Sequence, residues 1–306
     1  MTGMKSLSLK TNFYRAAQSR LFVRVLFAIS VALLIATVFS WWYFVYGSSD
    51  RVFWRMIDTS LSTASFTRTI AQDDSYQQVR QVTATRTAPD QVAFSSTRIT
   101  QGESSEVDVT TENLGTPRQD FVRYTAIKAA PGDVPADLDT VLNVWGKATT
   151  VGNDTNGQIY NQSVLNIIPF GNLNKQDRIE LLGFIKENNV YNFRLKETKR
   201  DSLISRPLLV YEVQVDPKGY VETLQLYAQK VGLTQLASVD TAMYEGAERF
   251  VIDVTIDGWT NRLAEVSYED GARVERLSAY GVRHEFPSIP EDAIPYEELQ
   301  GRLWSE

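Results

Sequence analysis

The sequence predicts an α+β protein in which one membrane-spanning helix precedes an antiparallel β-sheet with helices. Three observations lead to this prediction. One apolar run near the N-terminus is long enough to cross a bilayer. The residues after it form many short segments in which apolar and polar side chains alternate, as in strands with one wet face. Helical patterns with clear caps stand between some of these segments.

The apolar run extends from Val25 to Tyr46 without a charge. At 1.5 Å per residue, a helix over it is about 33 Å long and spans a hydrocarbon core of about 30 Å. Trp41, Trp42 and Tyr43 crowd its end, where aromatic rings settle at the headgroup level. A cleaved signal peptide is the alternative, but its apolar region is about 7–15 residues and small residues follow it. We therefore expect an uncleaved transmembrane helix over 25–46.

The charges on either side of this run predict its orientation. All charged residues before it are basic, and they are Lys5, Lys10, Arg15, Arg20 and Arg24. The more basic end of a span stays in the cytoplasm. Residues 1–24 are therefore expected as a cytoplasmic tail, and the rest as the outer part of a single-pass protein of the cell membrane. The whole chain has a net charge of −6, so this outer part is acidic and no nucleic-acid partner is expected.

The inventory of reactive residues is small. The chain has no cysteine, which excludes disulfides, thiol catalysis and cysteine-based metal sites. Its one histidine, His284, lies between Arg283 and Glu285 in the predicted closing strand. Because neighbouring strand residues point to opposite faces, Glu285 cannot orient the imidazole. We expect His284 to be a solvent-side strand residue, and we predict no catalytic residue, metal or cofactor.

The first half of the outer part predicts a helix over 51–62 and then a meander of strands. The helix places Phe53, Met56 and Ile57 on one face. The strands are expected at about 66–71, 75–86, 91–100, 105–112 and 119–127. A turn and a short amphipathic helix are expected in 131–147. Residues 147–151 and 158–165 are expected as the two arms of a polar hairpin.

The second half has clearer signals. A helix capped by Asn174 is expected to run to about residue 187 with an apolar stripe of Ile179, Leu182 and Ile185. Residues 208–215 and 250–257 alternate as strands, the second with Asp257 outward. Asp216 and Pro217 begin a helix that Gly232 ends. Asp270-Gly271 closes a hairpin that places Glu265 opposite Arg276.

Residues 208–287 resemble the LolA/LppX-like lipoprotein-carrier superfamily of bacterial envelopes. The resemblance lies in "VYEVQVDPKG" before a helix, in "RFVIDVTIDGWTNRLAEVSYEDG", and in "RVERLSAYGVRHEFP". In the last stretch, Tyr280-Gly281 and Pro287 stand where the family's closing strand ends. The family would imply a curved sheet, an incomplete barrel, with helices on its concave face and an apolar cavity between them. The membrane helix and the long insert at 130–200 depart from the family pattern, and a fixed anchor puts free shuttling between membranes in doubt.

The resemblance directs attention to apolar side chains that would line such a cavity. The predicted ligand-binding residues are Phe94, Phe121, Trp145, Ile167, Phe170, Phe184, Phe193, Tyr211 and Tyr227, with residues 165–185 as a lid. An ordinary core is the alternative for all of them. The expected domain covers 50–287, and 288–306 form a proline-rich C-terminal tail.

Three functions from different classes are compatible with the sequence. The first is a membrane-anchored, non-catalytic domain that binds a lipid, a lipoprotein or an acyl chain. The second is a ligand-free module of the cell envelope that senses or binds a protein partner. The third, an envelope hydrolase, is disfavoured because the sequence shows neither a nucleophile motif nor a second histidine.

Overall fold

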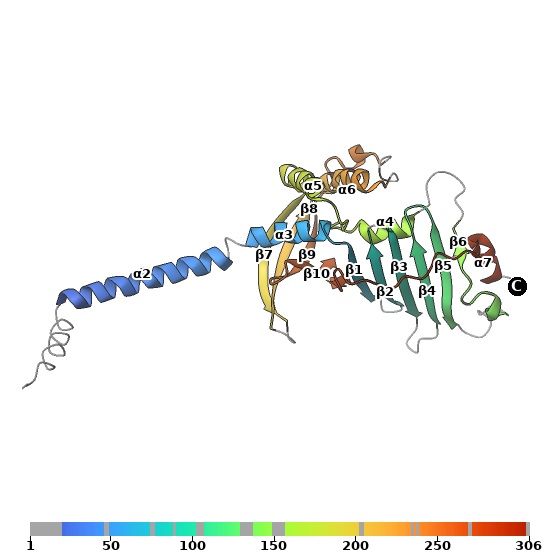
Figure 1. The fold of residues 1–306 in the computed structure, drawn as a ribbon, viewed down its shortest axis with the longest axis horizontal. Helices are drawn as coiled ribbons and strands as arrows, with labels where there is room; N and C mark the ends of the chain where they lie inside the picture. The colour runs from blue at the N-terminus through green and yellow to red at the C-terminus, as the bar shows by residue number, and fades with distance from the viewer. Residues whose placement is uncertain are drawn as a thin grey trace, which may run out of the picture. The chain divides into compact units, whose positions relative to one another are not determined.

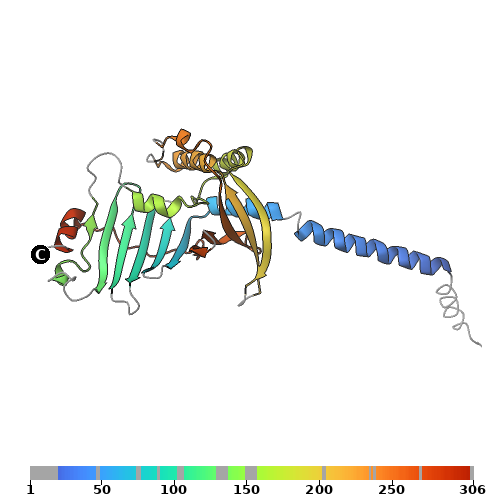
Figure 2. The ribbon, with the colours of Figure 1, turned by 180° about the vertical axis from the view of Figure 1, so that it is seen from behind.

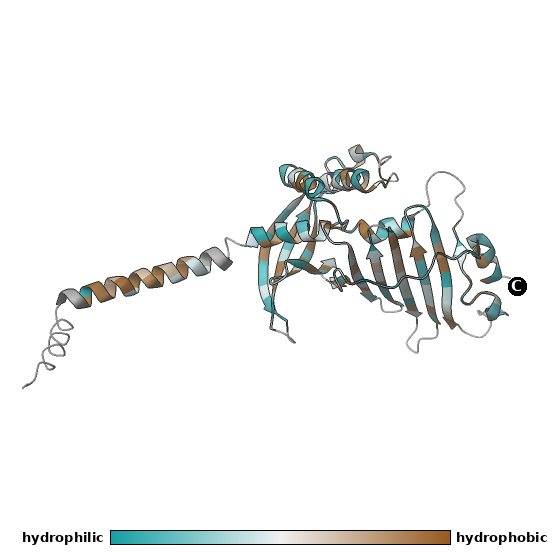
Figure 3. Ribbon diagram, in the orientation of Figure 1, coloured by the Kyte–Doolittle hydropathy of each residue, from teal (hydrophilic) through white to brown (hydrophobic). Residues whose placement is uncertain are grey.

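The computed structural model describes residues 20–45, 49–73, 77–87, 90–101, 107–128, 137–148, 157–201, 205–233, 236, 239–268 and 271–303. The chain divides after Val52 into two compact units. The first contains helix α2 (Arg20–Val45). Its stretch Val23–Trp41 is long and apolar enough to cross a membrane, and its side chains are exposed. Figure 3 shows the apolar colouring along this helix.

The second unit is built on a sheet of twelve strands among the described residues (Figure 1). Two antiparallel meanders join where β1 pairs with β11. The first meander consists of β1 (Ser65–Asp73), β2 (Gln77–Arg86), β3 (Val92–Gln101), β4 (Val107–Gly115) and β5 (Asp120–Lys128). The second consists of β7 (Tyr191–Arg200), β8 (Pro207–Val215), β9 (Phe250–Asp257), β10 (Arg262–Tyr268) and β11 (Arg273–Ser278). Two short strands, β6 (Gly146–Lys147) and β12 (Ile294–Pro295), pair in parallel beyond β5.

Helices cover one face of this sheet, which we call the inner face. They are α3 (Ser49–Leu61), α4 (Gln158–Val164), α5 (Lys175–Glu187) and α6 (Pro217–Val231). Phe53 of α3 stacks on Phe193 of β7 with 3.9 Å between ring centroids. Helix α4 lies across β2 to β5, and α5 and α6 pack on each other. The predicted class, α+β with a curved and mainly antiparallel sheet, is confirmed.

Local signals in the sequence explain where the long helices begin and end. The side chain of Asn174 accepts a hydrogen bond from the N–H of Asp177 at 3.0 Å, as predicted for the cap of α5. Asp216 caps α6 through the N–H of Gly219 at 2.7 Å, and Pro217 occupies the first turn. Gly232 ends the helix with φ +74°, a left-handed conformation that favours glycine.

The predicted strands of the first meander and of 208–215 and 250–257 are present. Arg276 lies opposite Glu265 on the neighbouring strand and donates to its carboxylate at 2.9 Å, as predicted. The turn residues of this hairpin, 269 and 270, lie outside the described residues.

Other predictions were wrong. Residues 158–164 form helix α4 instead of a hairpin arm. In the described part of 131–147, a 3-10 turn, Leu138–Thr140, and strand β6 replace the expected helix. Ile179 is 54% exposed, and Leu181 is buried in its place. Asp257 is buried and bonds to Arg206 at 2.7 Å instead of facing solvent.

The predicted closing strand and tail form a different structure. Strand β11 ends at Ser278, and residues 279–295 then run in an extended path across the outer face of the first meander (Figure 1). We call this segment the strap. Its start is fixed by a hydrogen bond from the N–H of Gly281 to the carbonyl of Ser65 at 2.8 Å. Its end forms β12, and helix α7 (Tyr296–Leu303) follows beside β6.

Candidate functional site

The sheet register defines an apolar row on the inner face. Val79 of β2 lies opposite Ile99 of β3, Ile99 opposite Val109 of β4, and Val109 opposite Ile127 of β5. Directly opposed residues of an antiparallel sheet share a face. The four side chains are half-buried. We call these four residues the apolar row.

No described helix lies over the apolar row. Helix α4 crosses β2 to β5 near the other ends of these strands (Figure 2). Its place is fixed by Gly115, where an added Cβ would come within 2.6 Å of Ile159. Between α4 and the apolar row, the inner face carries half-buried polar residues, among them Gln81, Thr97 and Thr111. Among the described residues, part of the inner face of the first meander is therefore uncovered.

The outer face of the same strand ends is charged. Arg80, Arg98, Asp108 and Lys128 alternate with the residues of the apolar row. Arg98 and Asp108 form an ion pair at 2.6 Å. An antiparallel sheet normally turns its charged face to water and its apolar face to a packing partner. The apolar row thus lies on the face that normally packs against another element. In the described structure no element covers the row.

The apolar row is not among the ligand-binding residues predicted from the sequence. A signal for it exists in "VDVT", residues 107–110, where valine alternates with polar residues. The pattern identifies which residues share a face. It does not identify which part of that face a helix covers, because α4 follows 30 residues after β5 in the chain.

Six of the predicted ligand-binding residues belong to the inner side of the domain. Phe170, Tyr211 and Tyr227 are fully buried, and Ile167 is 7% exposed. Phe193 is half-buried against Phe53, and Phe184 is half-buried on α5. Phe193 also lies edge-on to Tyr211, and Phe170 stacks on Phe66 of β1.

The predicted lid is held by tyrosine hydroxyls. Tyr191 donates to the carbonyl of Ile167 at 2.5 Å, and Tyr220 donates to that of Asn166 at 3.1 Å. Tyr227 donates to the carbonyl of Phe170. Burial raises the pKa of each of these phenols, so all three remain protonated donors at neutral pH. Residues 165–174 are therefore anchored in the domain.

The other three predicted residues lie on the opposite face. Phe121 is opposite Leu114, and Leu114 is opposite Phe94, which places all three on the outer face. Trp145 packs with them. The strap covers this cluster with Phe286 and Ala293. The nine predicted residues therefore do not line one cavity.

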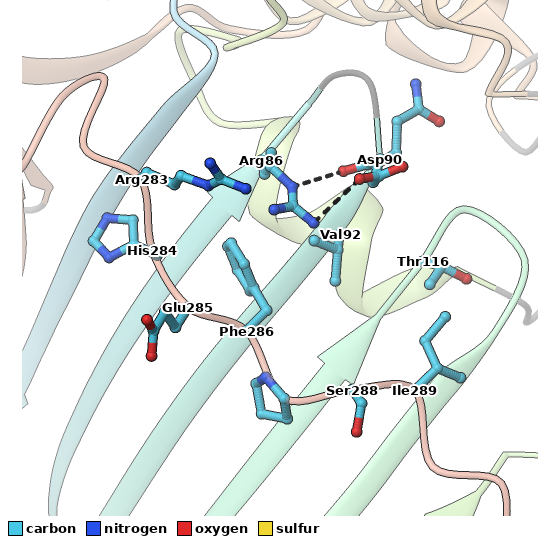
Figure 4. Close-up of a pocket in the computed structure, with 12 residues that line it drawn as sticks. Arg86, Asp90, Val92, Thr116, Arg283, His284, Glu285, Phe286, Ser288 and Ile289 are labelled. Atoms are coloured by element: carbon cyan, nitrogen blue, oxygen red, sulfur yellow. Dashed lines mark hydrogen bonds and ion pairs between the residues drawn. The ribbon is translucent and has the colours of Figure 1, made fainter.

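A pocket of about 850 Å³ lies where the strap crosses the ends of β2, β3 and β4 (Figure 4). Arg86, Val92 and Thr116 line it from the sheet side. Residues 283–289 of the strap, with His284 among them, line the other side. The imidazole Nε2 of His284 lies 3.2 Å from the hydroxyl of Thr67. The lone histidine is therefore half-buried beside a pocket and is not part of a strand.

Two buried acidic groups, Glu275 and Asp120, have structural roles. Arg68 and Glu275, both on the inner face, form an ion pair at 3.6 Å, and Arg273 also bonds Glu275 at 2.7 Å. Burial lowers the pKa of Arg68, and the charge of Glu275 partly opposes that effect. Asp120 accepts hydrogen bonds from the N–H groups of Gln158 and Ile159 at 2.9 and 3.2 Å, and so caps α4. Among the described residues, no group of three or more His, Asp or Glu could hold a metal ion.

No family model matches this sequence, and no curated protein matches it. The fold has a distant likeness among solved structures. The crystal structure of LprF from Mycobacterium bovis aligns with 78% of this chain and 95% of its own, at 11% identity and a TM-score of 0.40.

Proposed function

We propose that this chain is a membrane-anchored, non-catalytic domain of the cell envelope that binds an apolar ligand along the apolar row. The ligand would be a lipid, a lipoprotein or a free acyl chain. Helix α2 would be the anchor, with the sheet domain outside the cytoplasm. Its length and its continuous apolar surface support that role.

The observation that carries the proposal is the open apolar row opposite a charged outer face. Adjacent strands lie about 4.8 Å apart, so four strands place the outermost row residues about 14 Å apart. This length suits an extended stretch of acyl chain. The half-buried threonines beside the row offer hydroxyl groups to a more polar part of the ligand. The buried aromatic residues of the inner side are proposed as the rigid support of this surface.

The test uses the full chain in lipid vesicles that contain a phosphatidylcholine with a photoactivatable acyl chain. After illumination, mass spectrometry locates the cross-linked residues. Trypsin releases residues 99–118 as one peptide that holds both Ile99 and Val109. We expect cross-links on Ile99 or Val109 in addition to those on α2, the proposed anchor.

Two variants on one strand give a matched comparison. Val109→Asp places a charge in the apolar row and should reduce cross-linking of residues 99–118 severalfold. Thr110→Asp places the same charge one residue away on the outer face and should leave it unchanged. Cross-links confined to α2 in the unmodified chain would contradict the proposal. If a protein also cross-links to the apolar row in cells, the alternative function, a module that binds a protein partner, would be favoured.

A further inference from the structure

The outer pocket beneath the strap is separate from the apolar row, since it lies on the opposite face of the sheet. Its volume of about 850 Å³ is within the range of about 300–1,000 Å³ that small-molecule sites occupy. A second hollow of about 400 Å³ shares Arg86, Asp90, Arg283, His284 and Phe286 with it. The two hollows are therefore neighbours on the first part of the strap.

The pocket has an apolar wall. Val92 is buried at its base, and Phe286 of the strap packs on the cluster that contains Val92. Pro287 and Ile289 extend the wall, and Ile289 is 53% exposed. An exposed isoleucine beside a hollow gains from contact with an apolar ligand body, because that contact removes its surface from water.

The pocket also has a positive end. Arg86 stacks on the Phe286 ring at 5.1 Å and pairs with Asp90 at 3.6 Å, so its charge is largely compensated. Arg283 is exposed and forms no ion pair with any described residue. Figure 4 shows the Arg283 side chain extending toward Arg86, whereas Glu285 extends away from both. At this end of the pocket, the positive charge of Arg283 therefore has no acidic partner among the described residues.

From this arrangement we infer that the strap pocket binds a small amphiphile with one carboxylate group. The carboxylate would pair with Arg283, whose planar guanidinium offers two parallel donors to such a group. The apolar body would lie along Val92, Phe286 and Ile289. This inference does not depend on the function proposed for the apolar row.

The test measures binding of 11-(dansylamino)undecanoate to the full chain in nanodiscs, with empty nanodiscs as the blank. We expect saturable binding that dodecanoate displaces and dodecanol displaces much more weakly. Arg283→Gln should raise the Kd about tenfold, the effect of losing one hydrogen-bonded charge pair. Arg80→Gln, an exposed arginine on the outer face of β2 away from the pocket, should leave the Kd unchanged.

A further variant separates this pocket from the apolar row. Val109→Asp should retain the affinity for the dansyl probe, because Val109 lies on the other face of the sheet. Equal Kd values for Arg283→Gln and Arg80→Gln would overturn the inference. So would equal displacement by dodecanol and dodecanoate, or loss of probe binding in Val109→Asp alone.

Discussion

At the scale of single residues, Asp120 links the sheet to helix α4. Its carboxylate accepts hydrogen bonds from two backbone N–H groups at the start of α4, and the residue is only 5% exposed. Burial raises its pKa, and the backbone hydrogen bonds only partly oppose that effect. The unfolded chain therefore releases this proton at a lower pH than the folded chain does.

This difference predicts a pH dependence of stability. Between the unfolded pKa of Asp120, near 3.8, and its higher folded pKa, the unfolded state binds fewer protons. Its contribution to the free energy of unfolding must then fall as the pH rises through this window. Asp120→Asn cannot titrate, so its stability relative to the unmodified chain should rise from about pH 4 upward and level off above the folded pKa. Urea unfolding followed by tryptophan fluorescence measures this. A difference that stays constant with pH would contradict it.

Two phenylalanines and the histidine lie where no local sequence pattern could place them. The alternation of apolar and polar residues correctly places Phe94 and Phe121 at apolar positions of strands. It does not show that these positions lie on the outer face of the sheet. They lie outward because Phe286, more than 160 positions later in the chain, covers them. A distant partner of this kind leaves no local pattern. For the same reason His284, predicted on a strand, lies beside a pocket that only the strap and the sheet together create.

At the scale of elements, the strands and helices that were predicted correctly have strong local sequence patterns. Strand β8 alternates over its whole length, and α6 has Asp216, Pro217 and Gly232 at its ends. Strand β7 was missed because it is an edge strand with few apolar residues, in "YNFRLKETKR". Helix α4 was missed because it has seven residues, and its cap is Asp120 on a distant strand.

The position of α4 on the sheet leads to a prediction about two glycines. At Gly115 of β4, an added Cβ would lie 2.6 Å from the Ile159 side chain and 2.7 Å from the backbone N of Tyr160. Gly115→Ala must therefore displace α4, at a cost of about 1–3 kcal/mol in the free energy of unfolding. At Gly183 of α5, an added Cβ meets nothing within 4 Å.

Gly183→Ala is the matched control for this experiment. It should stabilise the protein by about 0.5–1 kcal/mol, because alanine loses less backbone entropy than glycine in a helix. Chemical denaturation of both variants measures the two effects. Similar stabilities for Gly115→Ala and the unmodified chain would show that α4 does not rest on β4 as described.

At the scale of the whole molecule, the sequence carries information about membrane topology that the packed domain does not. Both candidate sites lie in the sheet domain, so with α2 as the proposed anchor a ligand would come from the side of the membrane on which that domain lies. The basic residues before α2 favour a cytoplasmic N-terminus, and the acidic remainder is then outside. A lipid or acyl ligand would accordingly reach the apolar row from the outer leaflet or from the extracytoplasmic space.

The absence of cysteine in the sequence makes this topology directly testable. Ser6→Cys introduces a thiol before α2, and Gln101→Cys introduces one at the exposed end of β3. In intact spheroplasts, a membrane-impermeant maleimide should label Gln101→Cys and leave Ser6→Cys unlabelled until the membrane is permeabilised. Because the native chain has no thiol, every labelled molecule reports the introduced position. Labelling of Ser6→Cys alone would reverse the orientation and place both candidate sites in the cytoplasm, where the proposed envelope function fails. Labelling of both thiols in intact spheroplasts would mean that α2 does not span the membrane.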